Sequence, residues 1–127
     1  AAEKPAHIPA ADLVMTLGHY TFDTNLPITA GTHTLRIENS AEQPHEVVIA
    51  KLQPGKTPDD LLKFIMKPEG VPPGEIIGGV TGIARGEVNQ VTYEFTAGEY
   101  ALICFVPDAK DGKPHFMHGM VKQFTVS

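Results

Sequence analysis

The chain has 127 residues and a formal net charge of −5 at pH 7, with 10 Lys and Arg against 15 Asp and Glu. This length suits a single domain with one core, and an acidic chain without clustered basic residues argues against nucleic acid as a partner. No apolar run reaches the eighteen or so residues of a membrane span. We therefore expect one domain over residues 1–127, with a flexible N-terminal segment at 1–11 and no direct membrane span.

Short strands separated by turns are predicted in the first half of the chain. The predicted strands here are residues 12–17, 20–22, 33–38 and 45–52. In the third of these, Leu35 and Ile37 alternate with polar residues and so share one face. The fourth begins at His45, directly after Pro44, and continues as an apolar β-branched run.

One helix is predicted next, over residues 58–66. Thr57 has the character of an N-cap, Pro58 suits the first helical position, and acidic residues follow in the first turn. The apolar stripe of this helix is predicted to consist of Leu61, Leu62 and Ile65.

The second half again favours strands, at residues 76–80, 88–95, 100–105 and 121–126. Within residues 88–95, alternation places Val91, Tyr93 and Phe95 on one side. About seven to eight short strands with turn residues between them, and one short helix in a connection, predict an all-β, antiparallel Greek-key sandwich.

The only cysteine, Cys104, opens a segment rich in metal-ligand side chains. His115 and His118 follow it, as do Met117 and Met120. Thiolate and thioether are soft donors that suit Cu(I), and imidazole suits both oxidation states of copper. A trigonal site of one Cys and two His with a weak axial Met needs another histidine, for which His45 is the obvious source. A single cysteine also excludes an internal disulfide.

Three segments of the chain resemble the cupredoxins, the plastocyanin and azurin group of small blue copper proteins. They are Asn39-Ser-Ala-Glu-Gln-Pro-His45-Glu-Val-Val, Gly98-Glu-Tyr-Ala-Leu-Ile-Cys104 and Gly119-Met120-Val-Lys-Gln-Phe-Thr-Val. The resemblance covers about residues 12–126. It implies a cupredoxin-like sandwich that holds one copper ion through His45, Cys104, His115 and Met120. It also implies that the loop histidine reaches the surface within an apolar patch, to which Phe116 and Met117 could contribute.

Two features depart from the family pattern. Ten residues separate Cys104 from His115, more than in the small electron carriers, although the four residues between His115 and Met120 match plastocyanin. Glu46 stands where the family commonly has Asn. His118 is an alternative to His115 as the second histidine ligand, and Met117 is a weaker alternative to Met120 as the axial ligand. No role is assigned to the other three histidines, His7, His19 and His33.

The resulting functional prediction is one-electron transfer by Cu(I)/Cu(II) cycling in a non-enzymatic monomer. Its partner would be a redox protein. The first residues, Ala1-Ala-Glu-Lys-Pro, resemble a mature N-terminus left by cleavage of a signal peptide. That indicates a periplasmic or otherwise extracytoplasmic location. The alternative is sequestration of copper or its delivery to an acceptor protein, which an open, flexible loop after Cys104 would favour. A small copper enzyme with an open coordination position is a third possibility, and a thiol hydrolase is disfavoured because nothing marks an activated nucleophile.

Overall fold

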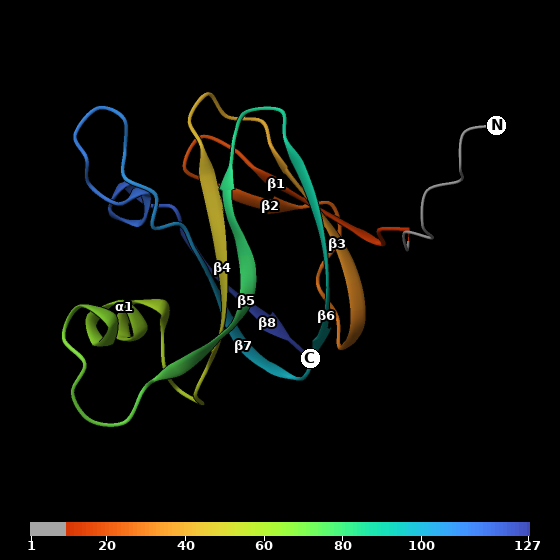
Figure 1. The fold of residues 1–127 in the computed structure, drawn as a ribbon. Helices are drawn as coiled ribbons and strands as arrows, with labels where there is room; N and C mark the ends of the chain where they lie inside the picture. Colours follow the sequence, from red (N-terminus) through yellow and green to blue (C-terminus); the bar gives the residue numbers. More distant parts are fainter. Residues whose placement is uncertain (1–9) are drawn as a thin grey trace.

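The computed structural model describes residues 10–127, so nearly all of the predicted N-terminal segment 1–11 lies outside the described residues. Within residues 10–127, eight strands, one α-helix and one 3₁₀ helix follow one another (Figure 1). The strands are β1 (Leu13–Leu17), β2 (Phe22–Thr24), β3 (Gly31–Asn39), β4 (His45–Leu52), β5 (Gly74–Ile83), β6 (Val88–Phe95), β7 (Gly98–Ile103) and β8 (Val121–Val126). The helices are α1 (Pro58–Met66) and η1 (His115–His118).

The strands form two four-stranded sheets, in the orders β2-β1-β3-β6 and β5-β4-β7-β8 (Figure 1). This all-β sandwich with one short α-helix confirms the predicted fold class. The expectation of purely antiparallel pairing is wrong for one pair, because β1 and β3 are parallel, with Leu13 opposite Leu35. The short β2 runs antiparallel to β1 and ends with Thr24 opposite Met15, and residues 25–30 then lead into β3, so β3 runs in the same direction as β1.

The main core lies between the two sheets and draws side chains from both. Leu35 and Ile37 of β3 are fully buried there, as their alternation predicted. They meet Ile49 of β4 and Leu102 of β7 in the same cluster. Both sheets therefore close over a single apolar core, as expected when each sheet buries one face.

A second apolar cluster covers the outer face of β4 and β7. Ala50, Leu52, Ala101 and Ile103 of these strands pack with Leu61 of α1. The cluster also receives Phe105 and Phe116 from the segment between β7 and β8. The two central strands are thus covered on both faces, and α1 and the segment after Cys104 lie on the same side of the sheet (Figure 1).

Helix α1 begins as its sequence predicts. The Thr57 hydroxyl accepts from the Asp60 N–H, and the Asp60 carboxylate accepts from the Thr57 N–H, which makes a capping box. Leu61 is buried, but the predicted stripe is wrong at Ile65, whose side chain is 38% exposed. Leu61 is the buried residue of the helix, and Leu62 packs against the same cluster, whereas Ile65 belongs to neither apolar cluster. No helix within residues 10–127 combines the length and apolar character needed to cross a membrane.

Candidate metal centre

The sheet brings two of the predicted ligands to one edge. His45 is the first residue of β4, and Cys104 directly follows the last residue of β7. Strands β4 and β7 pair antiparallel, with Val48 opposite Ile103, so the start of one lies beside the end of the other. His115 begins η1 and returns to the same edge, where its N–H donates to the carbonyl of Val106 at 2.8 Å.

Three ligand atoms converge at this edge. The Nδ1 atoms of His45 and His115 are 3.0 Å apart. The Cys104 Sγ lies 3.6 Å from Nδ1 of His115 and 3.9 Å from Nδ1 of His45. All three residues are buried, with exposures of 1% or less. One thiol sulfur and two imidazole nitrogens thus face a common point within the protein, as ligands of a single ion do.

Met120 closes the segment that carries the other ligands. Its N–H donates to the carbonyl of His115 at 3.1 Å, and its carbonyl accepts from the N–H of Cys104 at 3.2 Å. Its side chain is fully buried. The preceding Gly119 has φ +89°, a left-handed conformation that glycine adopts without steric cost and that turns the chain from η1 into β8. Cys104, His115 and Met120 are therefore tied together through the backbone.

The two alternatives of the same segment lie elsewhere. Nε2 of His118 lies 2.9 Å from a carboxylate oxygen of Asp111, and the His118 ring stacks on Tyr20. Potential ligand atoms of Asp108, Asp111 and His118 come within 4.8 Å of one another in this partly exposed group. Met117 is 58% exposed. The structure thus groups His115, and not His118, with His45 and Cys104.

The surface position that the family resemblance implies for the loop histidine is wrong, because His115 is fully buried. The lengthened segment after Cys104 folds back over its imidazole, and Asp108 of that segment lies against Nε2 at 3.3 Å. Tyr20 covers the ring from another side, edge-on with centroids 5.4 Å apart. Phe116 packs on Phe105 instead of forming a surface patch.

A polar network holds the far side of the His115 ring. Nε2 of His115 lies 3.1 Å from Oε1 of Gln43, and the Gln43 Nε2 donates to the Asp108 carboxylate at 2.9 Å. The Tyr20 hydroxyl also donates to that carboxylate, at 2.6 Å. Sequence reasoning missed Tyr20, Gln43 and Asp108, since a polar residue in a turn-rich segment is ordinarily solvated. The one available signal was the position of Gln43, two residues before a ligand histidine.

Tyr20 has an unusual backbone conformation. Its φ is +60°, and within residues 10–127 it is the one non-glycine residue with positive φ. For a bulky side chain this conformation costs on the order of 1–3 kcal/mol and persists only where surrounding contacts enforce it. Here it places the phenol over His115 and its hydroxyl on Asp108.

The thiol has its own partners. The N–H of Glu46 points at the Cys104 Sγ from 3.4 Å. The Glu46 side chain accepts from the N–H of Phe105 at 3.1 Å, which ties the start of β4 to the residue after the cysteine. Glu46 thus fastens together the two segments that supply the ligands.

Burial sets the protonation of the cluster. It lowers the pKa of His45 to about 4, helped by the neighbouring His115, and it also lowers the pKa of His115. Both imidazoles are therefore uncharged at neutral pH. Burial raises the pKa of the Cys104 thiol, so the metal-free protein keeps this proton at neutral pH. Hydrogen bonds from Tyr20 and Gln43 lower the pKa of Asp108, which stays a carboxylate.

A pocket of about 450 Å³ reaches the cluster beside His45. Its walls are polar and include two cationic side chains, Arg85 and Lys110, as well as Tyr20 and Gln43. The proposed donor set, of which His45 lines this pocket, fits copper better than a hard cation, because thiolate, imidazole and thioether suit Cu(I) and Cu(II), whereas Mg²⁺ and Ca²⁺ require oxygen ligands.

Comparison with known proteins shows relatives in structure and none in sequence. No protein-family model and no curated protein sequence matches the chain. Among solved structures, a sodium-dithionite-reduced auracyanin from the photosynthetic bacterium Roseiflexus castenholzii matches with a TM-score of 0.62 and 22% identity, over 90% of this chain and 94% of that one. Auracyanin B matches with a TM-score of 0.57 and 16% identity, over 95% and 93%.

Auracyanin A, a "blue" copper protein from the green thermophilic photosynthetic bacterium Chloroflexus aurantiacus, matches with a TM-score of 0.56 and 22% identity, over 90% of this chain and 98% of that one. These matches span nearly the whole length of both proteins in each case. The chain therefore has the fold of the cupredoxins, with His45, Cys104 and His115 gathered in a buried cluster at one edge of a sheet.

Proposed function

We propose that the protein binds one copper ion, which His45, Cys104, His115 and Met120 would hold, and serves as a one-electron carrier. The observation that carries this proposal is the convergence of one thiol and two uncharged imidazoles, all within 3.9 Å of one another, inside a cupredoxin fold. A bound copper ion would supply the one-electron couple between Cu(I) and Cu(II).

The protein's own contribution is to hold the donors still. His45 and Cys104 flank the β4–β7 ladder, and the Cys104 N–H donates a hydrogen bond to the Met120 carbonyl. His115 is held from behind by Gln43. Donors that keep their positions in both oxidation states leave little to rearrange when an electron arrives, which suits a carrier.

Proton release gives a first check on the ligand set. Because the Cys104 thiol is protonated and both imidazoles are neutral at pH 7, binding through these three residues must release about one proton per metal ion. Calorimetry of Cu(I) binding in buffers of different ionisation enthalpy measures that number. Release close to zero would contradict thiolate coordination, and Cys104→Ser is the matched control in which the release should vanish.

The alternative function, delivery of copper to an acceptor protein, would be favoured by an open and flexible segment after Cys104. That segment is instead closed by hydrogen bonds from Asp108 N–H to the Lys113 carbonyl and from Gly112 N–H to the Asp108 carbonyl, at 2.8 and 2.9 Å. A bridge between Pro107 and Pro114 joins its two ends. A closed segment over buried ligands supports retention of the metal. We also propose that the protein is not an enzyme. Met120 is buried and its backbone is hydrogen-bonded to Cys104 and His115, which supports a site whose positions are all filled by protein ligands.

The deciding experiment compares two rates on the copper-loaded protein. Electron exchange is followed by stopped-flow oxidation of the Cu(I) form with hexacyanoferrate(III), and metal release by transfer of Cu(I) to bicinchoninate. A carrier exchanges electrons within milliseconds to seconds and gives up copper over hours. Rapid loss of Cu(I) with slow oxidation would contradict the carrier and favour delivery.

We propose that residues 1–127 form a single domain, since both sheets share one core. We propose a periplasmic or otherwise extracytoplasmic monomer that exchanges electrons with a separate redox protein. Fractionation of the native host and analytical ultracentrifugation test location and oligomeric state.

A further inference from the structure

The ten residues between Cys104 and His115 build a specific structure. They fold into a closed loop, in which the N–H of Asp108 donates to the Lys113 carbonyl and the N–H of Lys110 donates to the Asp108 carboxylate at 3.0 Å. The loop therefore turns the Asp108 side chain inward, where the residue is only 4% exposed. A short connection between Cys104 and His115 would have no residue to place there.

The Asp108 carboxylate has a full set of partners. One oxygen accepts from the Tyr20 hydroxyl at 2.6 Å and from Nε2 of Gln43 at 2.9 Å. The same oxygen lies 3.3 Å from Nε2 of His115. A buried negative charge thus stands directly behind one of the proposed ligands, on the side away from the cluster.

Asp108 also decides which way the Gln43 amide faces. Because the NH₂ group of Gln43 donates to the carboxylate, its oxygen must face the other way, toward His115 Nε2 at 3.1 Å and the N–H of Ala109 at 2.8 Å. An acceptor at Nε2 requires that nitrogen to carry the proton of a neutral imidazole. The lone pair is then on Nδ1, the atom that faces Cys104 and His45.

We propose that Asp108 is a positioning residue of the copper site, which acts through Gln43 to fix His115 with a free Nδ1 and whose buried charge favours Cu(II) over Cu(I). This inference rests on the proposed function. Tyr20 moderates the effect, since the hydrogen bond from its hydroxyl withdraws charge from the same carboxylate. Partners behind a ligand imidazole typically change metal affinity by about 10- to 100-fold.

The tautomer is tested first, in the metal-free protein, by the ¹⁵N NMR shifts of the His115 ring. The parent protein is expected to show a protonated Nε2 and an unprotonated Nδ1. Asp108→Asn places an amide beside Gln43, allows the Gln43 amide to turn over, and should introduce the opposite tautomer. The matched control is Asp111→Asn in the same loop, whose carboxylate pairs with His118 and should leave the His115 shifts unchanged. A protonated Nδ1 in the parent, or unchanged shifts in Asp108→Asn, would overturn the positioning role.

The charge effect is tested by voltammetry of the copper-loaded proteins. Asp108→Asn is expected to raise the reduction potential, by about 59 mV if the preference for Cu(II) falls tenfold. Tyr20→Phe keeps the ring but frees the carboxylate of one donor, so it should lower the potential. Opposite shifts distinguish an electrostatic effect from simple loosening, which would move both variants in the same direction and would overturn the proposal.

The NMR and voltammetry measurements distinguish failure of the proposed function from failure of the inference about Asp108. If the protein binds no copper, the NMR result still decides the positioning role while the proposed function fails. If copper binds and neither variant changes the tautomer or the potential, the function stands and the inference about Asp108 fails. Should Asp108→Asn not fold, the parent tautomer and the sign of the Tyr20→Phe shift decide the question.

Discussion

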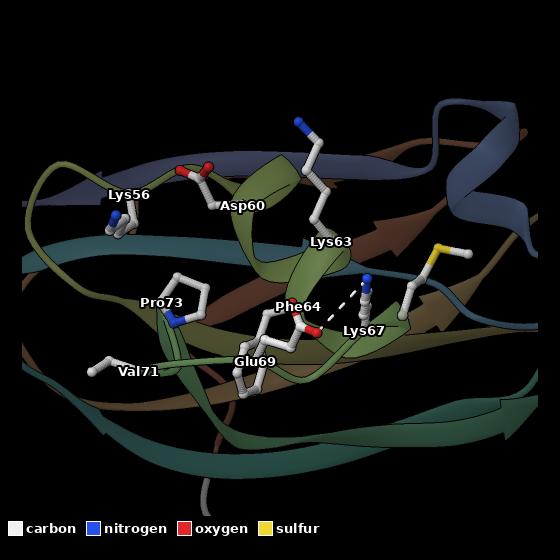
Figure 2. Close-up of a pocket in the computed structure, with 9 residues that line it drawn as sticks. Lys56, Asp60, Lys63, Phe64, Lys67, Glu69, Val71 and Pro73 are labelled. Atoms are coloured by element: carbon white, nitrogen blue, oxygen red, sulfur yellow. Dashed lines mark ion pairs between the residues drawn. The ribbon is translucent and has the colours of Figure 1, made fainter.

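The metal-site edge of the sandwich and the groove beside α1 both carry ionisable side chains, but in opposite surroundings. The groove is lined by charged residues, among them Lys63, Lys67 and Glu69, which surround the apolar Phe64 and Pro73 (Figure 2). Its ion pairs are exposed, as in Lys63–Asp59 at 3.0 Å and Lys67–Glu69 at 3.7 Å. Such pairs contribute little to stability because water screens them.

At the metal-site edge, the His115 imidazole and the Asp108 carboxylate are buried and have specific partners. The side chains of His115 and Asp108 have exposures of 0% and 1%. Because these side chains are buried, the fold determines their protonation and orientation. In turn, the stability of the fold depends on their protonation and orientation. Burial with specific partners, as at the metal-site edge, is therefore what distinguishes a polar group that can take part in metal binding from one that is only solvated at the surface.

The largest expected difference between the two regions is in their response to acid. His45 has a pKa of 6.5 in the unfolded chain and about 4 in the folded protein, so between these values the unfolded state binds more protons. The free energy of unfolding of the metal-free protein should therefore fall as the pH drops from 6.5 to about 4, by up to roughly 3 kcal/mol. Urea unfolding at a series of pH values measures this loss, and His115, whose pKa is also lowered, adds to it.

His45→Leu is the matched control for that prediction. It removes the titrating group while filling much of the same space, so the pH dependence in this window should become shallower. A variant with the slope of the parent would contradict the burial argument. His33, which pairs with Asp12 and has a raised pKa, loses its contribution only above pH 6.5 and does not affect this window.

A smaller effect is expected at the start of α1. Thr57→Ala removes the capping hydroxyl that accepts from the Asp60 N–H, and the loss of such a cap costs about 1 kcal/mol. Thermal unfolding of the metal-free protein measures it. Thr57→Ser keeps the hydroxyl and should restore stability, whereas equal losses in both variants would show that the cap is not the cause.

The smallest effect is expected within the groove itself. Lys63→Ala breaks the exposed pair with Asp59, and the change in unfolding free energy should lie within the error of a denaturation curve. Copper affinity should also be unchanged. A clear loss of stability would show that the groove is not the solvated surface that its exposure indicates.

Much of the fold could be predicted from local patterns. Alternation located β3 and β6, and the Thr57 cap located α1, because these signals act within a few residues. The parallel pairing of β1 with β3 has no local signal, since it depends on how the short β2 returns the chain. The inward face of α1 was misjudged at Ile65 because periodicity does not reveal how wide the contact with the sheet is.

The site could be predicted only in part. Ligand chemistry and family order singled out Cys104, His45 and His115, and the structure brings these three together. The partners of His115 could not be predicted, because Asp108 lies in a run of turn residues and Tyr20 is 95 positions before His115 in the chain. Their role arises from the folded loop and from a strained backbone at Tyr20, neither of which leaves a periodic pattern.

The most direct test of the central claim is the visible and EPR spectrum after one equivalent of Cu(II) is added to the reduced, metal-free protein. The account predicts an intense thiolate-to-copper charge-transfer band that is lost in Cys104→Ser and His115→Ala and retained in His118→Ala. No such band in the parent protein, or a band lost in His118→Ala and kept in His115→Ala, would contradict a copper site built on His45, Cys104 and His115.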